Sequence, residues 1–248
     1  MAQPGGVLTR AGHTEAGVDL AMLSGLEPAA VLVEILDEDG TMARRPQLEA
    51  FAQKHDLKIG TIAELIRYRL ETERSVECLC SSDVDTDFGA FRMLTYRDSI
   101  NDELHLALLM GEVDPAEPML VRVHVQNPLS DVLSIRREDF GLPLRLAMAE
   151  IARQGKGLLL VLGGHEDNDS LLRRIQKHPE PKIFSGGDSR QSNELRTYGI
   201  GAQIIVDIGI RKMRVLSAPK RMTGLAGFGL EVIEYVDSEH DADDTLKE

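Results

Sequence analysis

Apolar side chains in the first 72 residues recur mainly at helical spacing. The pattern predicts a helix that begins near His13 and stops at Gly25, a second over residues 46–55 and a third over residues 61–71. The third opens with a capping box, because Thr61 is followed three residues later by Glu64. The side chains that carry this periodicity are Ala16, Leu20 and Leu23, then Leu48, Phe51 and Ala52, then Ile62, Leu65, Ile66 and Leu70.

Residues 31–36 break the helical pattern with a short apolar run that contains β-branched side chains. Such a run predicts a buried strand, followed by a turn at residues 37–40. Glu34 interrupts it, and a carboxylate in a buried strand is costly unless it is paired, protonated or bound to a ligand. Alternatively, one side of the strand faces solvent and Glu34 simply points outward.

From residue 76 onward, short strand-like runs replace the helical spacing. Strands are predicted at residues 76–80, 88–96, 104–110, 120–125, 157–162, 213–217 and 230–236. Helices are predicted at residues 142–153, near residues 171–177, and from Glu194 to Gly209, with a polar loop at residues 179–193. Antiparallel strands followed by alternating helices and strands indicate an α/β or α+β domain.

Composition narrows the function classes. A formal net charge of −13 argues against a nucleic-acid partner, because phosphate backbones are bound by basic surfaces. No apolar run is long enough to span a membrane, and the first residues lack the pattern of a signal peptide, so a cytoplasmic location is expected. Residues 237–248 are acidic without apolar periodicity and are expected to be disordered.

The chain has two cysteines, Cys78 and Cys80, which as alternate residues of a strand would share a face. Two ligands do not make a zinc site, and a disulfide between them is not expected. They are interpreted as reduced thiols.

Candidate chemistry concentrates at residues 10–20, where a glycine-bearing segment becomes a helix. Arg10, His13 and Thr14 would lie at or near the helix N-terminus, where unpaired backbone N–H groups and the helix dipole favour an anion such as phosphate. The spacing alone leaves two interpretations open. The segment forms a phosphate or metal site, or Thr14 merely caps the helix and His13 is a surface residue.

Residues 5–20 resemble the signature of the 3,4-dihydroxy-2-butanone 4-phosphate synthase family, and residues 25–29, 33–35 and 39–44 continue the match in order. The resemblance implies conversion of ribulose 5-phosphate to a four-carbon phosphate and formate with Mg²⁺ or Mn²⁺. It further implies that His13 is a metal ligand and catalytic residue. Arg10 and Thr14 would bind the substrate, and Glu34 would be an acid/base or substrate contact.

The resemblance starts in the middle of the family's domain. The acidic cluster that supplies that family's other metal ligand and main proton-transfer groups is absent. Residues 1–72 are therefore expected to be the C-terminal part of a partial sheet-and-helix synthase domain, and Met1 an internal methionine of a longer protein. This chain alone is expected to be inactive. The family's homodimers lead us to expect a homodimer here.

Residues 76–236 resemble GTP cyclohydrolase II, which many bacteria fuse to the synthase. The matching segments are residues 88–92, 105–108, 121–124, 195–203, 213–216 and 224–232. That family holds zinc through three cysteines, whose counterparts here are Asn127, Glu138 and Phe140. Because a phenylalanine cannot bind a metal, zinc is not expected.

The glycine-rich segment of that family corresponds to residues 163–169, which are acidic here and would repel a triphosphate. Arg122, His124, Glu194 and Arg196 remain at positions of the degenerate site. Of these, Glu194, which stands where that family usually has an aspartate, and Arg196 are interpreted as retained fold determinants. The domain is thus expected to be catalytically inactive. The alternatives are a module for dimerisation or for nucleotide- or flavin-dependent regulation, and residual cyclohydrolase activity.

Overall fold

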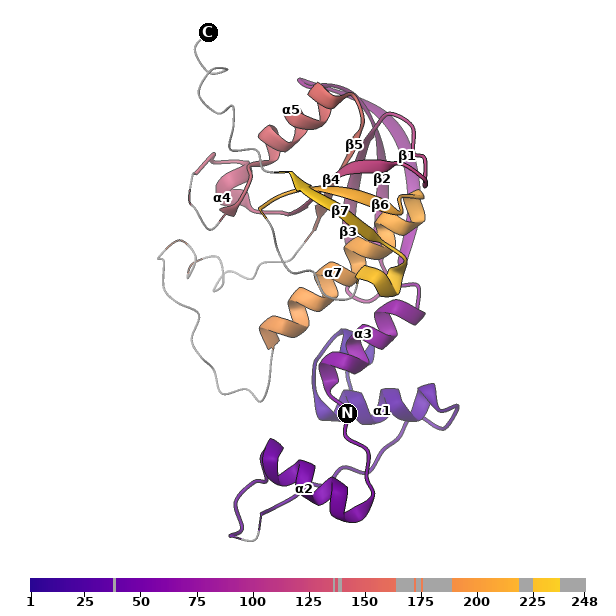
Figure 1. The fold of residues 1–248 in the computed structure, drawn as a ribbon, viewed down its shortest axis with the longest axis vertical. Helices are drawn as coiled ribbons and strands as arrows, with labels where there is room; N and C mark the ends of the chain where they lie inside the picture. Colours follow the sequence, from indigo (N-terminus) through magenta and orange to yellow (C-terminus); the bar gives the residue numbers. More distant parts are fainter. Residues whose placement is uncertain are drawn as a thin grey trace. The chain divides into compact units, whose positions relative to one another are not determined.

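Figure 1 shows the computed structural model, which describes residues 1–37, 39–135, 137, 140–163, 172, 175, 189–218 and 225–236; for residues 189–194 it describes the backbone alone. The chain divides into two compact units. The first comprises Met1–Glu73 with Ser185–Arg196, and the second Arg74–Phe184 with Thr197–Glu248. Within the described residues, no helix combines the length and the apolar character that crossing a membrane requires.

Short helices form the described part of the first unit: η1 (Gly6–Leu8), α1 (His13–Leu23), α2 (Arg45–His55) and α3 (Ile62–Thr72). The expected capping box is confirmed, since the Thr61 hydroxyl accepts from Glu64 N at 3.1 Å and Glu64 Oε2 accepts from Thr61 N at 3.0 Å. The expected stop of α1 is also confirmed. Gly25 adopts φ +72° just beyond Leu23, and Leu26 N donates to Ala21 O, closing a Schellman motif.

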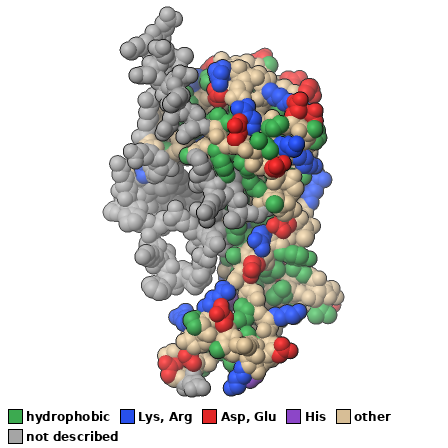
Figure 2. Space-filling model, in the orientation of Figure 1, with side chains coloured by type: hydrophobic (Ala, Val, Ile, Leu, Met, Phe, Trp, Pro, Cys, Tyr) green, Lys and Arg blue, Asp and Glu red, His purple; other side chains and the backbone are tan. Residues whose placement is uncertain are grey.

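The buried face of α1 is not the one that carries its leucines. Leu20 and Leu23, which recur at helical spacing, are exposed by 56% and 43%, whereas Glu15 and Asp19 are buried. The carboxylates turn inward because backbone N–H groups and arginines meet them there. Figure 2 shows hydrophobic side chains at the surface in the lower part of the view, where α1 and α3 lie.

The predicted buried strand at residues 31–36 is also wrong for this structure. The segment is irregular, apart from one isolated bridge between Leu36 and Met42, and Val31 and Val33 are 94% and 82% exposed. A strand needs a hydrogen-bonded neighbour, and the described part of the first unit contains no sheet for this segment to join. Glu34 is accordingly exposed.

The second unit is built on a mixed sheet, seven-stranded within the described residues, in the order β1-β2-β3-β5-β4-β6-β7 (Figure 1). Its strands are β1 (Val76–Thr86), β2 (Gly89–Asp98), β3 (Glu103–Met110), β4 (Pro118–Val125), β5 (Gly157–Leu162), β6 (Lys212–Leu216) and β7 (Glu231–Val236). The first three strands pair antiparallel, and β4 runs parallel to both β5 and β6. The expected α/β (α+β) class is confirmed.

Helices cover both faces of this sheet. On one face α5 (Leu144–Gln154) buries Ala147 and Ile151 against a cluster that includes Leu159. On the other, the residues of α7 (Ser189–Ile208) that belong to the second unit, such as Ile204, pack against a cluster that includes Leu160. Successive side chains of a strand point to opposite faces. Every residue of β5 is therefore buried, as its continuous apolar sequence indicates.

Two elements of the second unit extend beyond their predicted bounds. β1 continues to Thr86, although its residues 77–83 are exposed, because backbone pairing with β2 sustains it without burial. α7 begins at Ser189, inside the predicted polar loop. A shift of register between Cys78 and Cys80 interrupts the expected alternation, and both are exposed, unbridged thiols. Of the predicted helix near residues 171–177, the structure describes residues 172 and 175 alone, both helical, while the rest of the polar loop and the tail at residues 237–248 lie outside the described residues.

Candidate functional site

The start of α1 carries two of the predicted site residues, His13 and Thr14. Gly12 is the N-cap, His13 is the first helical residue and is exposed, and Thr14 is half-buried. Because Gly12 occupies the N-cap position, Thr14 is not the capping residue. The first N–H groups of an α-helix have no partner within the helix, so this terminus has the backbone geometry that favours an anion.

Arg10 reaches this terminus through an ion pair with Glu15. Its Nη2 lies 2.9 Å from Glu15 Oε1, and the same oxygen accepts from Gln3 N at 2.9 Å. The two partners differ in exposure, since the Arg10 side chain is 54% exposed and that of Glu15 is 0% exposed. Burial raises the pKa of Glu15, but hydrogen bonds from Gln3 N and Arg10 outweigh it and lower the pKa overall.

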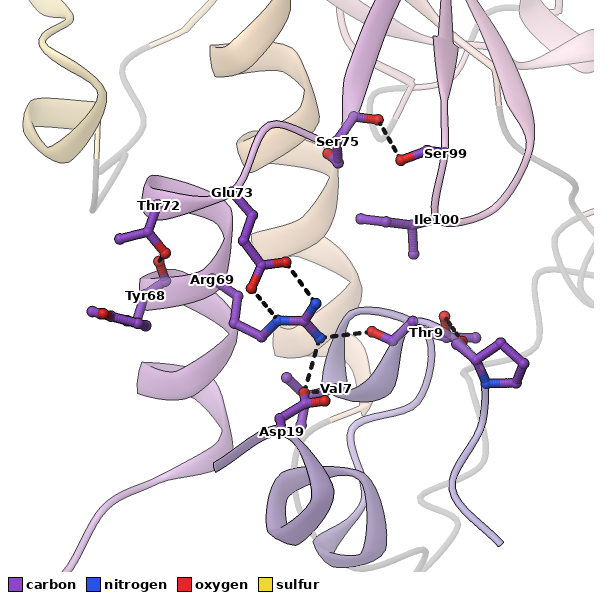
Figure 3. Close-up of polar contacts among 12 residues, drawn as sticks. Val7, Thr9, Asp19, Tyr68, Arg69, Thr72, Glu73, Ser75, Ser99 and Ile100 are labelled. Carbon is purple, nitrogen blue, oxygen red and sulfur yellow. Dashed lines mark hydrogen bonds and ion pairs between the residues drawn. The ribbon is translucent and has the colours of Figure 1, made fainter. Parts of the chain in front are cut away.

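One turn along α1, Asp19 forms the second buried contact. Its Oδ2 accepts from Val7 N at 2.8 Å and from Arg69 Nη1 at 2.9 Å. Arg69, on α3, also donates to Gly5 O at 2.8 Å and pairs with Glu73 at 2.6 Å (Figure 3). The hydrogen bond to Glu73 raises the pKa of Arg69 against the effect of burial. This network fixes α1, η1 and α3 to one another.

Glycines make room for both carboxylates. Gly6 has φ +61°, and a Cβ there would lie 1.9 Å from Asp19 Oδ1. A Cβ at Gly12 would lie 2.4 Å from Glu15 Oε2. Distances below 3 Å do not occur between real Cβ atoms and their neighbours, so the two acids and the two glycines depend on each other. The segment before His13 is therefore shaped by side chains of the helix that follows it.

Glu34 lies in the irregular segment that passes α1. That segment packs against the helix at Gly17, where a Cβ would be 2.9 Å from Ala30 Cβ and 3.2 Å from Leu32 Cδ2. The carboxylate of Glu34 itself is exposed. Its proposed acid/base or substrate role stays a prediction.

The described residues offer few ligands for a metal ion. No group of three or more His, Cys, Asp or Glu side chains gathers there in a way that could hold one. Glu15 follows His13 by two positions, about 200° around the helix, so that Glu15 points inward while His13 faces solvent. His13 alone does not fit the octahedral, mainly oxygen-ligated site that Mg²⁺ prefers.

In the second unit, the residues carried over from the cyclohydrolase motif make internal contacts. Arg122 donates to Leu216 O and Leu142 O, each at 3.1 Å, and burial lowers its pKa. His124 is buried with Nε2 2.9 Å from Asp131 Oδ2. Burial raises the pKa of Asp131, but hydrogen bonds, chiefly from His124 and from Asn127 N, lower it overall.

The positions that correspond to zinc ligands hold other contacts. Asn127 caps the short helix α4 (Pro128–Asp131), where its Oδ1 accepts from Leu129 N at 3.2 Å. The guanidinium of Arg137 lies 4.7 Å from the centre of the Phe140 ring. Glu138 and residues 164–169 lie outside the described residues. The contacts of Asn127 and Phe140 are of the kind that stabilise a fold.

Arg196 belongs to the part of α7 that lies in the first unit. Its Nη2 donates to Val7 O at 2.7 Å, and burial lowers its pKa. Only the backbone of Glu194 is described, within the same helix. The hydrogen bond of Arg196 is to a backbone carbonyl, the contact expected of a residue that holds the fold.

Sequence reasoning missed Glu15, Asp19 and Arg69, which fix the geometry of the α1 terminus. One signal was available. Glu15 and Asp19 are four residues apart and therefore share a helix face, which lies about a quarter turn from the face of Ala16, Leu20 and Leu23. Arg69 gave no signal, because its partner is 50 residues away in the chain.

Comparison with known proteins identifies two family segments. The model for "GTP cyclohydrolase II" matches residues 77–237, and the model for "3,4-dihydroxy-2-butanone 4-phosphate synthase" matches residues 1–68. A 3,4-dihydroxy-2-butanone 4-phosphate synthase of Pseudomonas aeruginosa is 48% identical over 242 residues, which cover 96% of this chain and 64% of that protein. The "Riboflavin biosynthesis protein RibBA" of Aquifex aeolicus is 47% identical over 95% of this chain and 60% of its own length.

A solved structure shares the fold. The crystal structure of RibBX, described as a two-domain 3,4-dihydroxy-2-butanone 4-phosphate synthase from A. baumannii, matches with a TM-score of 0.74 and 44% identity, over 95% of this chain and 62% of that one. This chain thus spans less than two thirds of the length of these relatives. It belongs to the GTP cyclohydrolase II family through residues 77–237, joined to the C-terminal part of a synthase domain of riboflavin biosynthesis.

Proposed function

We propose that residues 1–68 supply the substrate-phosphate site of a 3,4-dihydroxy-2-butanone 4-phosphate synthase, which converts ribulose 5-phosphate into that product and formate. The observation that carries the proposal is the start of α1, where Arg10 is held by a buried carboxylate beside a helix N-terminus. A guanidinium and helix-terminal N–H groups together offer charge-assisted hydrogen bonds to a phosphate. The resemblance to the synthase family supports the same assignment.

In this proposal, Arg10 and Thr14 bind the phosphate or hydroxyl groups of the substrate, and Glu34 contacts the substrate or transfers a proton. His13 is the candidate ligand for the family's Mg²⁺ or Mn²⁺, which would acidify sugar hydroxyls when bound. The described residues do not complete a metal site around His13. We therefore assign substrate binding, with proton transfer as the alternative role of Glu34, to this chain's residues and expect no turnover by the chain alone.

We also propose that the second unit is catalytically inactive. Asn127 and Phe140 occupy positions where the cyclohydrolase resemblance expects zinc ligands, and both have other contacts here. A hydrolytic zinc needs three protein ligands and an open position. Saturable binding of GTP without turnover would indicate a regulatory module instead, and stoichiometric zinc with GTP hydrolysis would contradict this proposal.

The proposal is tested by calorimetric titration of the chain with ribulose 5-phosphate, together with an assay for released formate in the presence of Mg²⁺. We expect weak binding that Arg10→Ala weakens at least tenfold, corresponding to one charge-assisted hydrogen bond of about 1.5–3 kcal/mol. Arg45→Ala is the matched control, because Arg45 is an exposed arginine of α2 that pairs with Glu49 of the same helix. Equal affinity in the Arg10 and Arg45 variants would refute the assignment. Formate release by the unmodified chain would refute the expectation that the chain alone is inactive.

A further inference from the structure

The ion pair between Arg10 and Glu15 is unequal. Glu15 is removed from solvent, whereas more than half of the Arg10 side chain remains accessible. Burying a carboxylate is costly, and an ion pair with a half-exposed arginine gives little stability in return. Such a pair does little for the fold, but it restricts where the arginine points.

The position of Glu15 is itself fixed from several sides. Its Oε1 accepts from Gln3 N at 2.9 Å, and its Oε2 lies so close to Gly12 that a Cβ there would be only 2.4 Å away. The same hypothetical Cβ would lie 3.3 Å from Arg10 Nε, so the guanidinium and the carboxylate flank one backbone position. Within the described residues, Oε2 has no hydrogen-bond partner although it is fully buried. The hydrogen bond from Gln3 N and the close backbone of Gly12 thus restrict the position of the carboxylate.

We propose that Glu15 is a positioning residue, which holds the Arg10 guanidinium at the N-terminus of α1 so that its remaining N–H groups are presented to a phosphoryl group. This inference rests on the proposed function for the phosphate and adds a residue that the motif analysis did not select. Orientation and charge make opposite predictions for Glu15. As an anchor Glu15 strengthens phosphate binding, whereas as a negative charge beside the site it weakens binding.

The first test measures the anchor without any ligand. Nuclear magnetic resonance relaxation of the Arg10 Nε–Hε group should show an ordered side chain in the unmodified protein and a mobile one in Glu15→Gln. The glutamine keeps an acceptor for Gln3 N but loses the charge that pairs with Arg10. Glu49→Gln is the control, because it makes the same change of net charge beside Arg45 on α2. An Arg10 side chain that is equally mobile in the unmodified protein and in Glu15→Gln would overturn the inference, whatever the protein binds.

The second test titrates the same proteins with inorganic phosphate and follows the His13 and Thr14 amides. Glu15→Gln should bind phosphate about tenfold more weakly, and this loss should vanish in the Arg10→Gln background, because the two side chains act as a unit. Unchanged or tighter binding by Glu15→Gln would overturn the inference, since Glu15 would then not strengthen phosphate binding by positioning Arg10. If Arg10 is ordered by Glu15 but the unmodified chain takes up no phosphate, the proposed function fails instead.

Discussion

Gly6→Ala is the substitution that tests most sharply how the α1 terminus is held. Gly6 has φ +61°, a conformation that costs an alanine about 1–2 kcal/mol. The new Cβ would also lie 1.9 Å from Asp19 Oδ1 and would displace this carboxylate from Val7 N. A hydrogen bond to a charged group contributes about 1.5–3 kcal/mol. Together these terms predict a loss of roughly 2.5–5 kcal/mol from the first unit.

Gly25→Ala separates the two terms. Gly25 has φ +72°, but no atom of the described residues lies within 4 Å of a hypothetical Cβ, so the backbone cost of about 1–2 kcal/mol applies alone. Native-state hydrogen exchange of the Val7 amide is the assay, because this N–H donates to Asp19 directly. Protection should fall by roughly two to four orders of magnitude in Gly6→Ala, and by about 5- to 30-fold at most in Gly25→Ala. Equal losses of protection in Gly6→Ala and Gly25→Ala would refute the close approach of Asp19 to Gly6.

Three further changes test the ion pairs and titratable groups. Arg69→Met leaves Asp19 buried without its cation and should lower the free energy of unfolding, measured by hydrogen exchange, by about 3–5 kcal/mol. Arg67→Met, in an exposed pair, should lower it by under about 1 kcal/mol. Equal losses in the two variants would contradict the network. Burial lowers the pKa of His105, so its contribution to the free energy of unfolding is present above about pH 6.5 and is lost as the pH falls through the lower folded pKa. In urea titrations at several pH values, His105→Gln should therefore make the free energy of unfolding less dependent on pH in this range. Asp131→Asn should lower the free energy of unfolding by about 1–3 kcal/mol at pH 7. Because the pKa of Asp131 is lowered in the fold, the difference between the variant and the unmodified protein should shrink below about pH 4. A difference that persists at that pH would show that the charge of Asp131 is not its cause.

Local signals in the sequence were sufficient for the helices of the first unit that lie within residues 1–73. The Thr61 and Glu64 pair and the glycine after α1 act through neighbouring backbone groups, so their effect does not depend on distant partners. The apolar sequence of β5 was equally informative, because a strand covered on both faces is apolar throughout.

Predictions failed where the outcome depends on distant partners. The leucines of α1 follow a helical period, but the period does not say which face is covered, and here Val7 N and Arg69 draw the carboxylates inward. Residues 31–36 have the composition of a strand but no neighbour to pair with in the described part of their unit. Sequence motifs located Arg10, His13 and Thr14, whereas the pairing of Glu15 with Arg10 emerges only from the geometry.

The most direct test of the central claim is a nuclear magnetic resonance titration of the ¹⁵N-labelled chain with ribulose 5-phosphate. The account predicts that the largest amide shifts occur at His13 and Thr14, together with a shift of the Arg10 Nε–Hε signal. Saturable shifts confined to the second unit, for example at Asn127 and Gly163, would contradict it. They would place the binding site in the cyclohydrolase-like unit instead.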